Sequence, residues 1–240
     1  EEGWTGFGIE VVDPDSGDLA WSWDSQEAVD AGQLPLPESD KDPYHANSAW
    51  WTTDRDGPAI YVSLRDQDAL VRLDRDTGLF SWTLGVGGDF TLLDEAGEPA
   101  DDEDWFYLQH APELTDETLV VYDNGHGRPG GAYSRVVIYT LDLAARTLQQ
   151  VWDWTEEDWL EPVWGDADLL EDGNVLVARG HCWDCSSADP DGRSALIELE
   201  PQQDVPTWRL DFIGEFDGLY RAQRIDGCAL FSNLRWCPGP

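Results

Sequence analysis

The 240-residue sequence is poor in basic side chains and contains no methionine. Lys41 is the one lysine, and 14 Lys and Arg residues stand against 50 Asp and Glu, which gives a formal net charge of −36. Binding to nucleic acid or to anionic lipid needs a basic surface that neutralises phosphates, so this charge argues against both classes of protein. Long hydrophobic runs are missing as well, which excludes a membrane-spanning helix.

The apolar content argues against the other class that such a charge suggests, a disordered acidic chain. Hydrophobic residues make up 41% of the sequence, and 14 residues are tryptophan. Disordered chains lack the apolar surface that offsets the entropy of folding. We therefore expect a folded protein whose length suffices for one core or one array of repeats.

The cysteines are few and lie towards the C-terminus, at Cys182, Cys185, Cys228 and Cys237. An even number in an acidic, Trp-rich chain predicts two disulfides and an oxidising compartment. The sequence leaves all three connectivities open. The alternative, a zinc site that uses His181, lacks a fourth ligand at a suitable spacing, so we favour the disulfides.

The absence of methionine includes the first position, because the chain begins Glu1-Glu2-Gly3. Such a start is typical of a mature product from which a signal peptide has been removed. Together with the cysteines, it predicts an extracytoplasmic location, either periplasmic, secreted or surface-anchored.

A repeated strand–turn–strand pattern is the strongest internal signal. In each copy, a strand rich in β-branched and aromatic residues leads through an acidic turn to a second strand that carries tryptophan. The copies are Ile9–Trp23, Leu70–Leu84, Val136–Trp154 and Ala195–Leu210. The pattern predicts an all-β fold, in which only residues 24–32 and 155–159 are suited to a helical turn or two.

Another pair of strands precedes three of these copies, at residues 47–64, 111–122 and 166–178. Adding each pair to the hairpin that follows gives four antiparallel strands, which is the composition of one β-propeller blade. The predicted fold is therefore a single β-propeller domain over residues 1–240, with blades at about 45–85, 110–154 and 165–212. Long inserts such as residues 89–104 are expected on one rim.

The two ends of the sequence each hold half of a blade, at residues 6–24 and 219–232. Either the two halves join into one closing blade, which gives about four blades in all, or the chain is part of a larger propeller. We favour the second interpretation.

Acidic turns occur at Asp13–Gly17, Asp74–Gly78 and Asp189–Gly192 and are similar to calcium-binding loops. None supplies the ligand set of an EF-hand loop. Asp and Gly also form tight turns without any metal, so we expect no cofactor and no metal site, with calcium as the alternative.

Two of the four histidines come before the first strand of neighbouring blades: His45 and His110. The innermost strands of a propeller line its central channel, so the two imidazoles are expected at one mouth of that channel. Arg65 and Arg135 follow the second strands of the same blades. Imidazole serves as a nucleophile or a general acid, and guanidinium holds oxyanions, so the set suits an anionic substrate.

Plainer interpretations of these residues stay open at this point. A histidine before a strand is more often a loop residue, and Arg65, next to Asp66, also fits a surface ion pair of little energetic value. His126 and His181 are expected to lie in loops and to have no chemical role.

Several motifs around these residues resemble those of the arylsulfotransferase (aryl-sulfate sulfotransferase) family. They are His45-Ala46-Asn47-Ser48 with Ser63-Leu64-Arg65, Gln109-His110-Ala111, Val121-Tyr122-Asp123-Asn124-Gly125 with Ser134-Arg135-Val136, Gly165-Asp166-Ala167 and Tyr220-Arg221-Ala222. The resemblance extends over most of residues 6–226, and the combined spacing is more specific than any single motif.

The resemblance implies a six-bladed propeller that is secreted or periplasmic. It further implies transfer of a sulfuryl group from a small phenolic sulfate ester to another phenol, without a nucleotide donor and through a sulfated histidine. In that scheme His110 matches the nucleophile and His45 matches a second active-site histidine that protonates the leaving phenolate. Asn47 and Arg65 match residues that hold the sulfuryl oxygens.

We add Asn124 and Arg135 as candidate substrate-binding residues. The alternative function is a non-catalytic binding or interaction propeller of the cell surface or periplasm.

Overall fold

The computed structural model describes residues 6–35, 42–115, 117–180, 194–203, 205–212 and 218–230. Regular structure in these ranges is almost entirely β, which confirms the predicted all-β class. The helices that it describes are short, namely α1 (Ser25–Asp30), α2 (Gly227–Leu230) and the 3-10 turns Arg65–Gln67 and Asp102–Asp104. Over the same ranges, no helix is long and apolar enough to span a bilayer.

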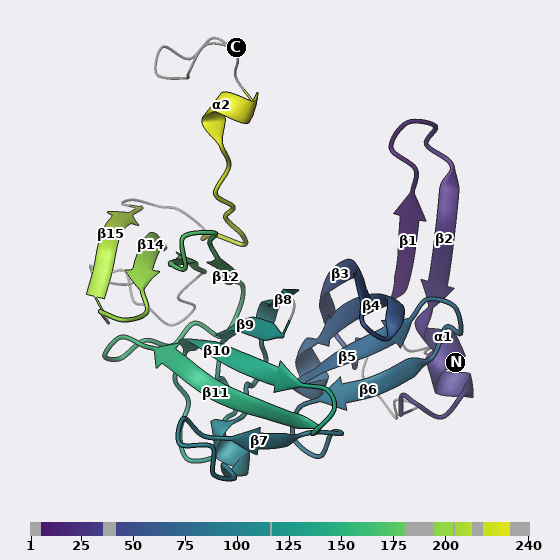
Figure 1. The fold of residues 1–240 in the computed structure, drawn as a ribbon, viewed down its shortest axis with the longest axis horizontal. Helices are drawn as coiled ribbons and strands as arrows, with labels where there is room; N and C mark the ends of the chain where they lie inside the picture. The colour runs from purple at the N-terminus through teal and green to yellow at the C-terminus, as the bar shows by residue number, and fades with distance from the viewer. Residues whose placement is uncertain are drawn as a thin grey trace.

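The strands form four sheets that follow one another along the chain (Figure 1). The first sheet is a hairpin of β1 (Gly8–Val12) and β2 (Leu19–Asp24). The second runs in chain order through β3 (Ala46–Asp54), β4 (Gly57–Leu64), β5 (Ala69–Asp74) and β6 (Phe80–Leu84). All of their neighbouring strands are antiparallel.

The third and fourth sheets repeat this order. The third contains β8 (His110–Thr115), β9 (Thr118–Asp123), β10 (Arg135–Asp142) and β11 (Thr147–Trp154), with β7 (Thr91–Leu93) parallel to the outer side of β11. The fourth contains β12 (Asp166–Leu169), β13 (Val175–Arg179), β14 (Ala195–Glu200) and β15 (Val205–Asp211). The ranges 45–85, 110–154 and 165–212 thus each hold four consecutive antiparallel strands, and β7 comes from the insert at 89–104.

The four predicted hairpins share one irregularity of register. In each, the pairing shifts at a bulge directly after the residue that faces a tryptophan of the second strand. These pairs are Val11–Trp21, Arg72–Trp82, Ile138–Trp152 and Glu198–Trp208. The sequence repeat is therefore also a repeat of backbone geometry.

The acidic turns of these hairpins are held by their own aspartates. One carboxylate oxygen of Asp13, Asp74 and Asp142 accepts two backbone N–H groups of its turn, at 2.8 to 3.0 Å. This is the turn chemistry of aspartate, which needs no metal. Within the described ranges no group of three or more His, Cys, Asp or Glu side chains is arranged to hold a metal ion. The turn at Asp189–Gly192 lies outside those ranges.

Successive sheets pack face to face through three clusters of buried side chains. Trp23 and Ala28 pack with Val62 and Val71, which joins the first sheet and α1 to the second. Two further clusters join the second sheet to the third and the third to the fourth. Central strands such as β9 are buried on both faces, which explains their continuous apolar sequence.

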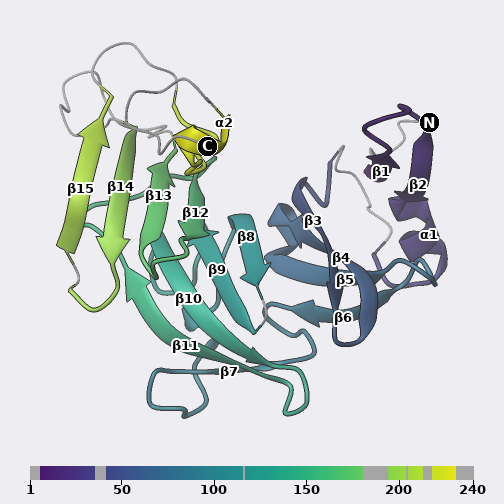
Figure 2. The same cartoon turned by 45° about the horizontal axis from the view of Figure 1, so that its top comes forward.

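The first strands of the larger sheets approach one another. Strand β8 contacts both β3 and β12, and Figure 2 shows these three strands at the centre of the row of sheets. The residues that begin these strands therefore come together, as the sequence analysis expected of residues before the first strands.

The predicted strand pair at 219–232 is wrong for the residues that the structure describes. Residues 218–226 form no strand, and Gly227–Leu230 form the helix α2. A strand needs a neighbour that accepts its backbone hydrogen bonds, and β1 and β2, the other half blade, lie apart from this segment at the far side of the second sheet (Figure 1). The segment instead follows the starts of β3, β8 and β12: Tyr220 Oη donates to the carbonyl of Asn47 (3.2 Å), and Ala222 N–H donates to Asp166 (3.1 Å).

The predicted disulfides are not tested. Cys182, Cys185, Cys237 and His181 lie outside the described residues. Cys228 lies in α2.

Candidate functional site

The candidate site is built from the same ends of strands in three neighbouring sheets. His45 directly precedes β3, His110 begins β8 and Asp166 begins β12. Arg65, Asn124 and Gly180 follow the second strands β4, β9 and β13 in the same manner. The repeated backbone structure thus brings six residues of different chemical types to the same end of the three sheets.

His110 lies at the centre of this place and is almost completely buried, with 4% of its surface exposed. Its Nδ1 lies 2.8 Å from Oδ1 of Asn124, and its Nε2 accepts the backbone N–H of Trp164 at 3.3 Å. The ring of Tyr220 meets the imidazole edge to face, with 6.2 Å between the ring centroids. Both ring nitrogens are therefore held by named partners.

The surroundings keep His110 neutral. Burial lowers the pKa of His110 to about 4. The bond to Asn124 opposes this and raises the pKa, whereas the charges of Arg65 and His45 have smaller lowering effects. A neutral imidazole at neutral pH has a lone pair that is available to an electrophile. The electrostatic effect of Arg65 and His45 also places both of them close to His110.

Asn47 reaches the site from a bulge of β3. The register of β3 against β4 shifts between Ala46 and Ser48, which leaves Asn47 out of the ladder. Its Nδ2 donates to the carbonyl of Gln109 at 2.7 Å, directly before His110, whereas its buried Oδ1 has no hydrogen-bond partner. An unpartnered acceptor in this position is suited to a donor on a ligand.

The guanidinium of Arg65 is bound by two partners, and one of its N–H groups has none. Its guanidinium bonds Asp66 at 2.5 Å and the carbonyl of Pro162 at 3.1 Å, across the gap between two sheets. The side chain is only 14% exposed, and its Nε lacks a partner. The predicted surface ion pair with Asp66 is real, but the arginine also carries a buried donor that is free to bind an anion.

His45 has a contrasting environment. Its side chain is 47% exposed, and Nδ1 lies 3.5 Å from a carboxylate oxygen of Asp42. An exposed imidazole beside a carboxylate can exchange protons with solvent, as a general acid or base must.

Two predicted substrate-binding residues are bound by groups of the protein itself. Arg135 begins β10 and is buried; its guanidinium bonds Asp123 (2.9 Å), the carbonyl of Asp104 (2.5 Å) and Gln150 (3.3 Å). These bonds join Arg135 to its own sheet and to the turn Asp102–Asp104. Asn124 does lie at the site, but its amide bonds His110 and two backbone carbonyls. His126 is exposed in a loop, as expected.

Backbone strain gathers at the same place. Non-glycine residues with positive φ include His45 (44°), Leu108 (50°), Ala111 (42°) and Trp164 (65°). Such conformations cost about 1–3 kcal/mol each and persist where the surrounding structure enforces them, often at functional sites. β8 also carries a bulge between His110 and Glu113. None of these features has a signal in the sequence.

Sequence reasoning assigned no role to four residues that the structure brings to the site: Gln109, Glu161, Trp164 and Asp166. Asp166 is buried, and desolvation together with the charge of Asp168 raises its pKa to about 7. Gly165-Asp166 stands where Gln109-His110 stands in the previous sheet, so alignment of the repeats was the signal that could have found it.

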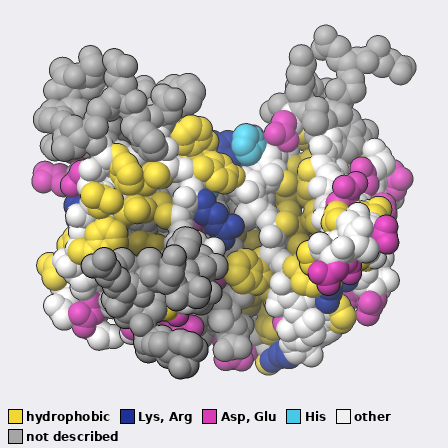
Figure 3. All heavy atoms as spheres, turned by 90° about the horizontal axis from the view of Figure 1, so that it is seen from above, with side chains coloured by type: hydrophobic (Ala, Val, Ile, Leu, Met, Phe, Trp, Pro, Cys, Tyr) yellow, Lys and Arg dark blue, Asp and Glu magenta, His cyan; other side chains and the backbone are white. Residues whose placement is uncertain are grey.

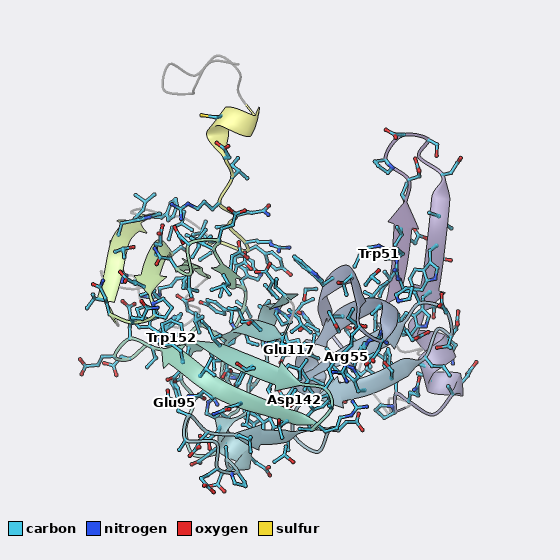
Figure 4. All side chains as sticks on the ribbon, in the orientation of Figure 1. Trp51, Arg55, Glu95, Glu117, Asp142 and Trp152 are labelled. Carbon is cyan, nitrogen blue, oxygen red and sulfur yellow. The ribbon has the colours of Figure 1, made fainter. Side chains whose placement is uncertain are left out.

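A small cavity lies beside these residues. A cavity of about 90 Å³ lies between β3 and β8 and is lined by Asn47, Ala111, Glu113 and Arg221, among others. In Figure 3 a histidine and basic side chains gather in the hollow between the two sides of the molecule. A larger cavity, about 750 Å³, lies at the other ends of the same strands, near Arg55 and Glu117 (Figure 4), and contains none of the predicted site residues.

Comparison with known proteins gives relatives of one kind. Arylsulfate sulfotransferase AssT of Escherichia coli O6:H1 is 33% identical over 166 residues, which covers 57% of this chain and 27% of that protein. AssT of Lelliottia amnigena is 35% identical over 86 residues, 31% of this chain and 14% of that protein. The chain therefore matches about a quarter or less of the length of these relatives. Among solved structures, hydrazine synthase of Kuenenia stuttgartiensis has a TM-score of 0.32 at 8% identity, over 75% of this chain and 52% of that one.

The family comparison extends over nearly the whole chain. The arylsulfotransferase (ASST) family model matches residues 8–221, a range that begins at β1 and ends beside Tyr220. It includes His45, His110 and the strands that carry them. The chain belongs to the arylsulfotransferase family.

Proposed function

We propose that this chain transfers a sulfuryl group from a small phenolic sulfate ester to a phenol, without a nucleotide donor and through a sulfated His110. Family membership supports sulfuryl transfer in general. The observation that carries the finer proposal is the buried His110, whose low pKa leaves it neutral and unprotonated at one nitrogen at neutral pH.

In the first half of the reaction, a ring nitrogen of His110 forms a bond to sulfur as the bond between sulfur and the phenolic oxygen breaks. The oxygen leaves with the electron pair, and His45 supplies the proton that neutralises it. In the second half, His45 takes the proton of the acceptor phenol, whose oxygen attacks sulfur and releases His110. One sulfuryl group and one proton move in each half.

The sulfuryl oxygens need fixed donors as charge develops on them. Arg65, with its unpartnered Nε, and the Nδ2 group of Asn47 are the donors that we assign to this task. Asn47 has to release the carbonyl of Gln109 or share its second N–H to do so.

We further propose that the four sheets are blades of a propeller and that the protein works outside the cytoplasm. The succession of four-stranded sheets packed face to face around β3, β8 and β12 supports the first statement. The even number of cysteines supports the second.

The direct test is turnover of an aryl sulfate that releases a coloured phenol, with a second phenol as acceptor. We expect release of colour and, without an acceptor, a gain in mass of one sulfuryl group on the peptide that contains His110. His126→Gln serves as the control, because His126 is exposed and has no part in the proposed reaction. Absence of both colour and mass gain would refute the proposal.

A further inference from the structure

We propose that Asn124 is the positioning residue of His110: it holds the proton on Nδ1 and so makes Nε2 the atom that attacks sulfur. The attack on sulfur rests on the proposed function, whereas the position of the proton rests on hydrogen-bond geometry alone. It replaces the expectation that Asn124 binds substrate.

The orientation of the Asn124 amide follows from its partners. Its Nδ2 lies 2.7 Å from the carbonyl oxygen of Glu161 and 2.9 Å from that of Trp164. Both are acceptors only, so the NH₂ group must face them, and a flipped amide would set oxygen against oxygen twice. Oδ1 of Asn124 therefore faces Nδ1 of His110, at 2.8 Å.

This orientation determines the tautomer of the imidazole. An amide oxygen can only accept, so Nδ1 of His110 must carry the hydrogen. A neutral ring with a hydrogen on Nδ1 has its lone pair on Nε2. The backbone N–H of Trp164, which can only donate, points to Nε2 at 3.3 Å and gives the same answer independently. That bond is longer than usual, so it is easily released when Nε2 binds sulfur.

The chemistry of an amide suits this position better than that of a carboxylate. When Nε2 binds sulfur, the ring becomes cationic and the hydrogen on Nδ1 more acidic. Oδ1 of Asn124 stabilises that charge but is too weak a base to remove the proton. The ring then leaves sulfur as neutral imidazole in the second half of the reaction, rather than as a poorly leaving imidazolate.

Asn124 can impose this geometry because its own partners are fixed. The carboxylate of Glu161 accepts from Tyr122 Oη, from Arg179 Nε (3.0 Å) and from the backbone N–H of Gly180 (2.7 Å). Its backbone N–H donates to Ser134 Oγ at 2.8 Å. The segment from Glu161 to Trp164 is thereby fixed to β9 and β13, and a preorganised support of this kind keeps a reacting group in place.

The charged and titratable groups that face His110 are Arg65 and His45, and Tyr220 covers the ring. The electrostatic effects of both groups lower the pKa of His110, and Asn124 orients the ring without adding a charge. An aspartate at this position would reverse that balance and raise the pKa of His110.

The experiment measures the tautomer directly. Long-range ¹H–¹⁵N spectra of the ¹⁵N-histidine-labelled 240-residue chain are expected to show His110 with a protonated Nδ1 and an unprotonated Nε2, unchanged from pH 8 to about 5. Asn124→Ala should lower the fraction of this tautomer, whereas Asn174→Ala should not. Asn174 is the matched control: it lies in the turn between β12 and β13, and its amide donates to Glu198 of β14.

Kinetics of the same variants complete the test. Asn124→Ala should lower kcat by roughly 10- to 100-fold with KM changed by less than about 2-fold, since loss of tautomer control affects the chemical step. Asn124→Asp should move the acidic limb of the kcat/KM profile to higher pH. A hydrogen on Nε2 in the wild-type spectrum, or an unchanged tautomer and kcat in Asn124→Ala, would overturn the inference. Lack of turnover in every variant overturns the proposed function instead, because the spectra need no substrate.

Discussion

His45 and His110 both lie at the start of the first strand of a sheet, in neighbouring repeats, yet their surroundings differ in almost every respect. His110 is 4% exposed and bonded at both ring nitrogens, whereas the side chain of His45 is 47% exposed and lies beside the carboxylate of Asp42. Burial lowers the pKa of His110, so that imidazole is neutral at neutral pH, whereas the side chain of His45 is open to solvent. This contrast is the basis for proposing the buried imidazole as the nucleophile and the exposed one as the proton carrier.

Of the substitutions that test this comparison, removal of His110 should cause the largest loss of activity. His110→Gln should lower kcat by about 10⁴-fold or more, because no other described group offers a neutral nitrogen at this place. Release of phenol from an aryl sulfate measures it. A variant that kept more than a tenth of the activity would show that the two histidines do not have the roles assigned.

Removing His45 should have a smaller effect that depends on the substrate. His45→Gln should lower turnover by about 10²- to 10⁴-fold for esters of weakly acidic phenols. For esters of nitrophenols the loss should be much smaller, since their phenolates leave without a proton. A series of esters, compared at one pH, checks this; equal losses across the series would contradict a proton transfer by His45.

Asn47→Ala removes a hydrogen-bond donor and an acceptor from the cavity between β3 and β8. We expect about a 10-fold loss in kcat/KM, the effect of one hydrogen bond to a charged group. Ser48→Ala is the adjacent control, because Ser48 lies outside the bulge in the paired part of β3. Equal effects of the two substitutions would assign the loss to the strand rather than to the side chain.

The smallest expected effect concerns stability rather than rate. The pKa of His110 falls from 6.5 to about 4 on folding, so the unfolded chain binds more protons and the free energy of unfolding falls as pH drops through that window. The pKa of Asp166 rises from 3.8 to about 7, so the folded chain binds more protons and this group stabilises as pH drops below about 7.

The two contributions oppose each other between pH 4 and 6.5. Urea unfolding at pH 7.5 and 5 should therefore show that His110→Gln makes the chain relatively more resistant to acid, whereas Asp166→Asn makes it relatively less resistant. The same sign for both variants would contradict these environments.

The features that the sequence predicted are those with a local cause. Hairpins such as Leu70–Leu84 follow from alternating residues and an aspartate that closes its own turn, and the place of His110 follows from its position before a strand. Arg135 could not be placed in this way. It begins β10, so its side chain joins Asp123 across the ladder, whereas Arg65 follows β4 and leaves the sheet.

The strained and tertiary features had no sequence signal. The positive φ of Trp164 and the carbonyls that orient Asn124 come from a segment more than 35 positions further along the chain. The segment 219–232 has the composition of strands, but strand formation depends on a neighbour that the sequence pattern does not specify.

The position of the buried arginines affects how an anion reaches the molecule. Arg72, Arg128, Arg135 and Arg179 are buried among carboxylates and carbonyls, so four of the 14 basic side chains of a chain of net charge −36 are hidden from solvent. A sulfate ester must then diffuse to His110 through a field that repels it. Added salt shortens the range of that field, so the rate of encounter should rise with ionic strength, the reverse of the behaviour of enzymes that attract their substrates electrostatically.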